Sequence, residues 1–274
     1  MTIVTLFSWA TPAFINNAPM DHTWVTTYDI RKTVYNNISQ VISAGEHAWY
    51  CWGNFHPTGK FLGSKSGNLQ FARCLVASNS SSNSNPPACG TIFTYGIDGV
   101  CHQLANQVLY ATGPAPLTVS KARWYLVSTF LYGTYGLQTT AWANKIATCK
   151  STGATLTMKA SPGSPKGAAP TAATDDAFAR HARATLRHRD ADALKALLEL
   201  RQTIHASRSE QSAAMQMTAQ TPTAEELNKR NRQFIKQAAD LLGKDKFIQV
   251  FGFSPDETVD LVDPDQMPGS ALKL

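Results

Sequence analysis

The chain has 274 residues, a formal net charge of +6 and a hydrophobic fraction of 43%. This fraction is ordinary for a globular protein, so a core of normal size can form without a metal or disulfide staple. No stretch of the sequence approaches the roughly 18 uninterrupted apolar residues that a membrane span needs. The composition therefore predicts a globular protein with no membrane span.

The N-terminal twenty residues are mildly apolar but lack the basic start and the continuous apolar core of a signal peptide. The cysteines are odd in number and include no CxxC pair, which argues against a disulfide framework and against a structural zinc site. They are Cys51, Cys74, Cys89, Cys101 and Cys149. We therefore expect a cytoplasmic protein. Export by a route that needs no signal peptide is a remaining alternative.

Acidic residues are scarce in the first 170 positions, which hold only Asp21, Asp29, Glu46 and Asp98. A basic region of this kind suits an anionic partner. Its lysines and arginines are scattered, however, and match no nucleic-acid motif. We therefore expect no binding of nucleic acid.

Residues 1–150 are expected to form a mixed α/β domain. Segments rich in β-branched and aromatic residues are separated by Gly, Asn, Pro and Ser clusters, as turns separate strands. The expected strands cover 23–30, 48–52, 69–76 and 91–95. An apolar stripe at helical spacing predicts a helix over 100–111, with Asp98 as its N-cap. Residues 123–133 fit a helix or a strand equally well, and 141–150 fit a short helix.

The composition changes after residue 150. Residues 151–174 are small, polar and rich in Pro and Gly, as expected of a linker. Residues 175–274 are expected to be a helical C-terminal region. A long helical stretch covers 175–208, and a break near Asp190 would divide it. A second helix is expected over 224–242, with Thr223 as its N-cap. The balanced charge of this region fits helices that dock a protein partner or that pack on the first domain.

Cys101 is the strongest candidate for chemistry. With Asp98 as N-cap, it occupies the third position of the helix, where free backbone N–H groups and the helix dipole favour a thiolate. Both effects lower the pKa of a thiol and make it a better nucleophile at neutral pH. The alternative is that Cys101 is a small buried hydrophobe, the more common role of a free cysteine.

A thiolate needs a base, and the base needs an orienting partner. His22 and His47 each begin an expected strand and each follow an acidic residue, Asp21 and Glu46. Histidines at corresponding ends of adjacent strands can face one helix N-terminus, where one takes the thiol proton and the other orients its ring. We therefore predict a catalytic set of Cys101, His22 and His47, with the choice of base left open and a pair of structural histidines as the alternative.

Further residues are expected to line the binding pocket: Trp49, His56, His102 and Gln103. Trp49 belongs to an aromatic strand that suits an apolar pocket or a core. His56 follows a turn signal and is an alternative third catalytic member. His102 points about 100° away from Cys101 on a helix, so it is a poor base for that thiol. No cofactor is expected, and a metal site built from His22, His47, His56 and Cys101 matches no known local zinc spacing.

The order of these residues distinguishes the chain from ordinary papain-like enzymes, in which the cysteine helix precedes the histidine strand. Here the histidines precede the cysteine. This order resembles that of the circularly permuted branch of the NlpC/P60 superfamily, which includes the lecithin:retinol acyltransferase-like proteins. The resemblance covers about residues 20–112, with His22 in HTWV, His47 in EHAW and Cys101 in GVCHQLAN in the three roles. It implies an α+β, papain-like domain in which an antiparallel sheet packs on a cysteine-bearing helix.

The resemblance also implies acyl chemistry on a peptide, amide or other acyl substrate. Cys101 would attack the carbonyl, backbone N–H groups at the helix start would stabilise the oxyanion, and Gln103 would help to polarise the carbonyl. The first hypothesis is a cysteine-dependent amidase or peptidase, and the second is an acyltransferase with the same site. A third is a non-enzymatic, toxin-like binding module in which the C-terminal helices dock a protein and Cys101 is structural.

Overall fold

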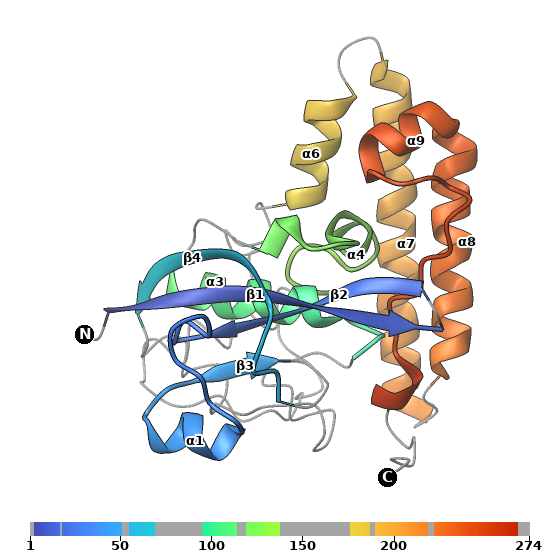
Figure 1. Cartoon of the computed structure of the whole chain (residues 1–274). Coiled ribbons are helices and arrows are strands. Elements are labelled where there is room, and N and C mark those ends of the chain that lie inside the picture. Colours follow the sequence, from blue (N-terminus) through green and yellow to red (C-terminus); the bar gives the residue numbers. More distant parts are fainter. Residues whose placement is uncertain are drawn as a thin grey trace.

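The computed structural model of the chain describes residues 3–16, 18–50, 55–68, 95–113, 119–137, 176–186, 190–218 and 222–267. Within these ranges the fold is α+β, with a four-stranded antiparallel sheet and seven α-helices that are concentrated toward the C-terminus (Figure 1). The expected strand at 69–76, the helix at 141–150 and the linker at 151–174 lie outside the described residues, as do Cys51, Cys74, Cys89 and Cys149.

The sheet has the strand order β3-β2-β1-β4. Its strands are β1 (Ile3–Ile15), β2 (Ala18–Thr26), β3 (Ala48–Tyr50) and β4 (Lys60–Asn68). β3 and part of β2 agree with the expected strands, whereas β1 and β4 were not predicted. β4 reads KFLGSKSGN and is largely polar. Among the described residues it is an edge strand that pairs with β1 only, and polar side chains are common on such strands.

The two faces of the sheet have different partners. Trp9 of β1 is paired with Trp24 of β2, and their ring centroids lie 6.1 Å apart on one face. This face packs against the short helix α1 (Ile38–Ser43) through the buried Val41. Side chains alternate along a strand, so the neighbouring residues Ala10 and Val25 turn to the other face and join the larger core around α3 (Cys101–Thr112).

The helix α3 agrees with the expected helix over 100–111 to within one residue at each end. Its C-terminal end is held by Lys65 of β4, whose Nζ donates to the carbonyl oxygen of Leu109 at 2.9 Å and to that of Gly113. A cation at this end of a helix meets unpaired carbonyls and the negative end of the dipole. The edge strand β4 therefore fixes α3 beneath the sheet.

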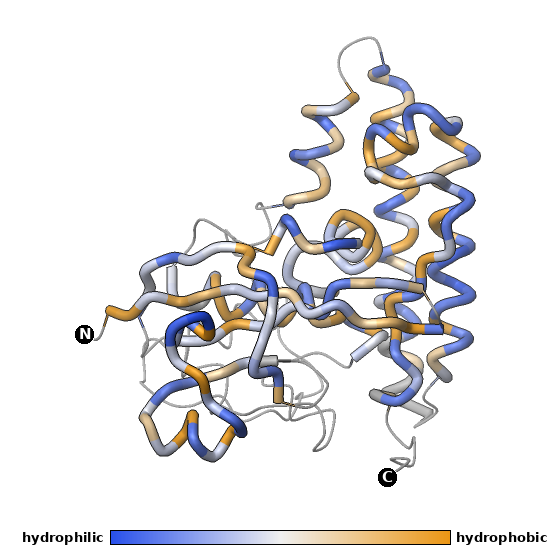
Figure 2. The backbone as a smooth tube through the Cα atoms, viewed as in Figure 1, coloured by the Kyte–Doolittle hydropathy of each residue, from blue (hydrophilic) through white to orange (hydrophobic). Residues whose placement is uncertain are grey.

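The segment that the sequence left undecided between helix and strand is the helix α4 (Tyr125–Tyr132), which follows a 3₁₀ turn at Val119–Lys121. α4 is largely hydrophobic and lies between the sheet layer and the C-terminal helices (Figures 1 and 2). Nearly all its side chains are buried. Burial on several sides explains why its sequence lacks the one-sided apolar stripe of a surface helix.

The expected C-terminal helical region forms four α-helices and a 3₁₀ turn: α6 (Ala177–Thr185), α7 (Ala191–Thr218), α8 (Ala224–Leu242), α9 (Lys244–Phe251) and Pro264–Gln266. α6 and α7 are separate helices on either side of 186–190, as the expected break near Asp190 required. Thr223 caps α8, with its Oγ1 accepting from the backbone N–H of Glu226 at 3.2 Å, as predicted.

The C-terminal helices share a hydrophobic core with the sheet region. Phe130 of α4 contacts Phe178 of α6 and Phe251 of α9, with ring centroids 5.1 and 5.3 Å apart. On α7, Arg201 and His205 both hydrogen-bond the carbonyl oxygen of Phe130. Of the two expected roles for this region, packing on the first domain is therefore observed. In the part of the chain that the structure describes, no helix has the length and apolarity that crossing a membrane requires.

Candidate functional site

Cys101 is the first residue of α3, not the third. The N-cap is Val100, whose backbone N–H donates to Oε1 of Gln103 at 3.0 Å. The prediction of Asp98 as N-cap was wrong. Asp98 is buried in the turn before the helix, where its backbone oxygen accepts from the N–H of Leu137 at 2.8 Å. The side chain of Gln103, inside the helix, therefore hydrogen-bonds the backbone at the helix start, the role that the sequence analysis gave to Asp98.

The Cys101 thiol is completely buried. Its Sγ donates to the backbone oxygen of Asp21 at 3.8 Å, and the backbone of Thr23 also contacts it. Burial raises the pKa of Cys101 to about 11, and the hydrogen bonds from Thr23 and His102 offset this only in part. The predicted lowering of the thiol pKa was therefore wrong for this structure, because the loss of hydration outweighs the helix N-terminus.

The thiol lies at an edge of β2. Residues two apart in a strand direct their backbone groups to the same side, so Asp21 and Thr23 face one edge together. On the other side, Asp21 is opposite Pro12, which has no N–H to donate. Within the described residues β3 pairs with β2 only from Trp24 to Thr26. The start of α3 therefore covers the edge of β2 just beyond that pairing.

His22 lies between the two residues that contact Cys101, but its ring is on the other face of β2. It is buried and its centroid is 5.1 Å from that of His56, which also contacts Trp24 at 5.8 Å. Burial, and then the neighbouring His56 and His102, hold the pKa of His22 well below its ordinary value. Burial also lowers the pKa of His56. Both rings are therefore uncharged at neutral pH.

His47 is far from Cys101. It stands opposite Thr27, with the N–H of Thr27 donating to its backbone oxygen at 3.0 Å. Thr27 is four residues along the chain from Thr23, which contacts the Cys101 thiol, and four residues correspond to roughly 13 Å in an extended strand. The His47 ring stacks on Trp49, with centroids 5.4 Å apart. The structure thus brings Asp21, Thr23 and His102 to Cys101. It leaves His47 beyond the end of β2, whereas Trp49, opposite Val25, packs in the same core as Cys101.

His102 approaches the same carbonyl as the thiol. Its Nε2 lies 3.1 Å from the backbone oxygen of Asp21, and its Nδ1 lies 2.8 Å from Oγ of Ser128. Since a carbonyl oxygen only accepts, Nε2 carries the proton and Nδ1 is the acceptor in the neutral ring. The one hydroxyl hydrogen of Ser128 is shared between this Nδ1 and the carbonyl oxygen of Tyr125, which lies 2.9 Å from Oγ. Burial lowers the pKa of His102 to about 4, so the ring is neutral. With both nitrogens engaged, His102 positions the start of α3 on β2.

Gln103, which was expected to line the binding pocket and to help polarise the substrate carbonyl, is completely buried. Its Nε2 donates to the carbonyl oxygen of Gly133 at 3.0 Å. Two amides that the sequence analysis missed continue the pattern: Asn106 Nδ2 donates to Thr134 O at 2.7 Å, and Gln107 Nε2 donates to Tyr135 O at 2.6 Å. The signal in the sequence was the spacing 103, 106 and 107, which places all three amides on one side of a helix.

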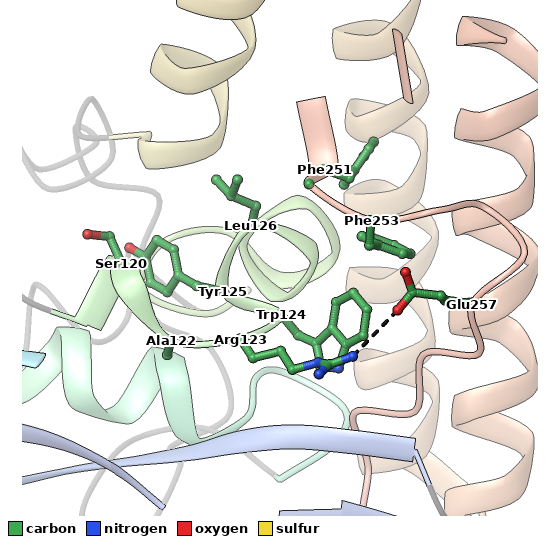
Figure 3. A pocket seen from close by; sticks show the side chains of 10 residues that line it. Ser120, Ala122, Arg123, Trp124, Tyr125, Leu126, Phe251, Phe253 and Glu257 are labelled. Atoms are coloured by element: carbon green, nitrogen blue, oxygen red, sulfur yellow. Dashed lines mark hydrogen bonds and ion pairs between the residues drawn. The ribbon is translucent and has the colours of Figure 1, made fainter. Parts of the chain in front are cut away.

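A cavity of about 410 Å³ opens near the residues that surround Cys101 (Figure 3). It lies between the start of α4 and the segment that ends α9. Two contacts connect it to the cysteine end of α3. The backbone N–H of Arg123 donates to Oδ2 of Asp21 at 2.9 Å, and the ring of Tyr125 meets that of His102 edge-on at 5.9 Å. Among the described residues, no three His, Cys, Asp or Glu side chains gather as metal ligands would.

Alkylation of Cys101 should be slow in the folded protein. With a pKa of about 11, the thiolate fraction at pH 7.5 is roughly a hundredfold below that of an ordinary thiol, and burial adds a barrier to the reagent. We expect the rate to rise with pH up to about 11, and to rise at least a hundredfold at pH 7.5 on unfolding in urea. Mass spectrometry of the Cys101 peptide measures both rates. Fast alkylation of the folded protein with a plateau below pH 8 would instead establish an activated thiolate.

Comparison of the chain with known protein families, with curated proteins and with solved structures finds no match.

Proposed function

We propose that the chain is a cysteine-dependent hydrolase of the amidase or peptidase type, with Cys101 as its nucleophile. The observation that carries the proposal is the position of the thiol. Cys101 opens α3 and its Sγ lies against β2, where Asp21 and Thr23 flank His22. A thiol at a helix start beside a histidine strand has the components of acyl chemistry: a nucleophile, free backbone N–H groups and imidazoles.

The same proposal assigns the sheet and α3 to a permuted papain-like arrangement of the NlpC/P60 type. Its support is the chain order, in which the histidine strand β2 precedes the cysteine helix α3, and the packing of that helix on an antiparallel sheet. His22 is the proposed base. It adjoins the two residues that hold the thiol, whereas His47 is at the far end of β2.

The resting site holds the proton on sulfur. The pKa of Cys101 is raised and that of His22 is lowered, so the neutral thiol and the neutral imidazole are both stable at pH 7. Substrate binding must therefore uncover the thiol and bring the His22 ring to it. The proton then passes from Sγ to the imidazole as sulfur forms a bond to the substrate carbonyl carbon. Backbone N–H groups at the start of α3 stabilise the oxyanion.

The second half of the reaction restores the cysteine. The imidazolium gives its proton to the departing amine or alcohol, which leaves an acyl group on Sγ. Water then attacks the thioester with the imidazole as base, releasing the carboxylic acid and the free thiol. An amine or alcohol in place of water would complete acyl transfer, so the same site serves a hydrolase and an acyltransferase.

Replacement of Cys101 by alanine tests the proposal. We expect turnover of chromogenic amide, ester and thioester substrates to fall by at least about 10³-fold, because no other group replaces the nucleophile. Cys101→Ser is the matched control, since it keeps a hydroxyl in the same volume, and it should also be strongly impaired. Equal turnover by the wild type and Cys101→Ala, or none by the wild type across the three substrate classes, would contradict the proposal.

A second candidate function is a binding module in which Cys101 is structural. The complete burial of the thiol and its raised pKa favour it. In that case Cys101→Ala leaves a small cavity and costs about 1–2 kcal/mol of stability, with no turnover to lose. Urea unfolding of the same variants, measured beside turnover, therefore separates the two functions.

A further inference from the structure

The cavity beside α4 has the features of a ligand site. Its volume of about 410 Å³ falls in the range of small-molecule pockets. Side chains from two distant parts of the chain meet there, from Ser120 to Leu126 on one side and from Phe251 to Glu257 on the other (Figure 3). None of its chemistry is used by the reaction proposed for Cys101, so the following inference is independent of that proposal.

Arg123 supplies unused hydrogen-bond donors at this cavity. Among the described residues, its guanidinium donates to Glu257 alone, at 3.4 Å, and both side chains are nearly half exposed, at 45% and 44%. An exposed pair of this kind contributes little to stability, so an incoming ligand displaces it at small cost. Glu257 keeps a second partner when Arg123 leaves, because its Oε1 accepts from the N–H of Ser254 at 3.1 Å.

The aromatic wall of the cavity is held by contacts on several sides. Trp124 has a backbone φ of 65°, in the left-handed region that an aromatic residue rarely adopts. Its indole is held by a hydrogen bond from Nε1 to the oxygen of Pro19 at 2.5 Å and by the edge-on ring of Phe253 at 4.4 Å. The guanidinium of Arg123 lies over this indole, 4.8 Å from its centroid. A cation–π contact of this kind orients the fork of donors beside an apolar surface.

We propose that this cavity binds a small organic carboxylate, with its charge on Arg123 and its apolar part against the small area that the buried Trp124 and Phe253 leave exposed to the cavity. The carboxylate of Glu257 occupies the place of the ligand in the unbound protein. A planar guanidinium matches a carboxylate with two parallel hydrogen bonds, which a single contact at 3.4 Å does not use. The donors left over on Arg123 favour an anion, whereas the negative charge of Glu257 beside them opposes it, so removal of that charge is expected to tighten binding.

The experiment is calorimetric titration of the full chain with 3-phenylpropionate, with its neutral amide as the matched probe. We expect the carboxylate to bind at least about tenfold more tightly than the amide, and Arg123→Gln to remove that preference. Glu257→Gln, which removes the competing carboxylate, should tighten binding by about threefold or more. Arg183→Gln, at an exposed arginine on α6, is the control and should bind as the wild type does. Circular dichroism establishes that each variant is folded.

Several results would overturn the proposal. One is the absence of binding by 3-phenylpropionate below about 10 mM, a limit already weak for a fragment of this size. Others are equal binding of acid and amide, or weaker binding to Glu257→Gln. Inorganic phosphate provides the last comparison. If it binds as tightly as 3-phenylpropionate and with the same dependence on Arg123, the site is a simple anion site and the assignment to an organic ligand fails.

Discussion

Replacement of Phe130 by alanine is expected to lower the free energy of unfolding by about 3–5 kcal/mol, the usual cost of removing a phenyl ring from a packed core. Phe130 is completely buried on α4, and its ring contacts Phe178 of α6 and Phe251 of α9. The truncation would remove contacts with two helices at once. It also opens a cavity between segments that are distant in sequence, which cannot collapse without moving both helices.

The measurement is urea unfolding followed by circular dichroism and by tryptophan fluorescence. Three of the six tryptophans, Trp9, Trp24 and Trp49, lie in the sheet, and Trp124 lies before α4 against Phe253. Most of the described helix content is C-terminal, so the two probes weight different parts of the chain. One shared core predicts that both transitions shift together. Ile248→Ala is the control, since that side chain is 38% exposed on the same helix as Phe251, and it should cost under about 1 kcal/mol. If Phe130→Ala showed two separate transitions, with the fluorescence transition at the same urea concentration as in the wild type, a shared core would be contradicted.

The Gly96→Ala change should be the second most costly, at about 2–4 kcal/mol from backbone strain and overpacking. Gly96 has a φ of +78°, and a Cβ at this position would lie 2.6 Å from Cγ1 of Val262 and 3.3 Å from Cδ1 of Leu227. Its N–H donates to the oxygen of Gly99 at 2.8 Å, in the turn that leads into α3. Movement of this turn would therefore also shift Cys101.

The chain offers a matched control for the backbone term. Gly45 has a φ of +73° and no atom within 4 Å of an added Cβ. Gly45→Ala should therefore cost only the strain of a left-handed backbone, about 1 kcal/mol. Thermal or urea unfolding of the two variants isolates the crowding at Gly96 as their difference.

A double-mutant cycle tests the cause of that crowding. Val262→Ala removes both methyl groups that the new Cβ would meet, at 2.6 and 3.2 Å. On this background Gly96→Ala should cost at least about 1 kcal/mol less than in the wild type, because residues in contact are not additive. Costs that add exactly, or a Gly96→Ala change no worse than Gly45→Ala, would exclude steric crowding by Val262.

Part of the fold could be predicted because its signals are local. The capping of α8 by Thr223 depends on Glu226, three residues away, and the apolar stripe that starts α3 recurs within one turn. Caps and apolar spacings of this kind depend on residues close in the chain, so they can be recognised without knowledge of the tertiary structure. β4 could not be predicted, because its polar sequence is a strand only through its pairing with β1. β strands are formed by partners distant in the chain.

The candidate site was predicted less well, and the reason is physical. The position of Cys101 at the start of a helix is a local property and was predicted to within two residues. The pKa of its thiol is not local, since it depends on burial against β2, which is 80 residues earlier in the sequence. Similarly, His22 was expected to begin a strand but lies in the middle of β2, whereas His47 directly precedes β3 as expected. The antiparallel register then separates the two histidines along β2.

The sequence by itself determined the helices with strong caps and stripes, the α+β class and the presence of one cysteine at a helix start. Only the tertiary structure decided which groups meet that cysteine, that Gln103 is buried and capping, and that Arg123 and Glu257 face each other across a cavity. Hydrogen bonds within one helical turn are set by neighbours in the chain. Desolvation and strand register are set by residues that only folding brings together.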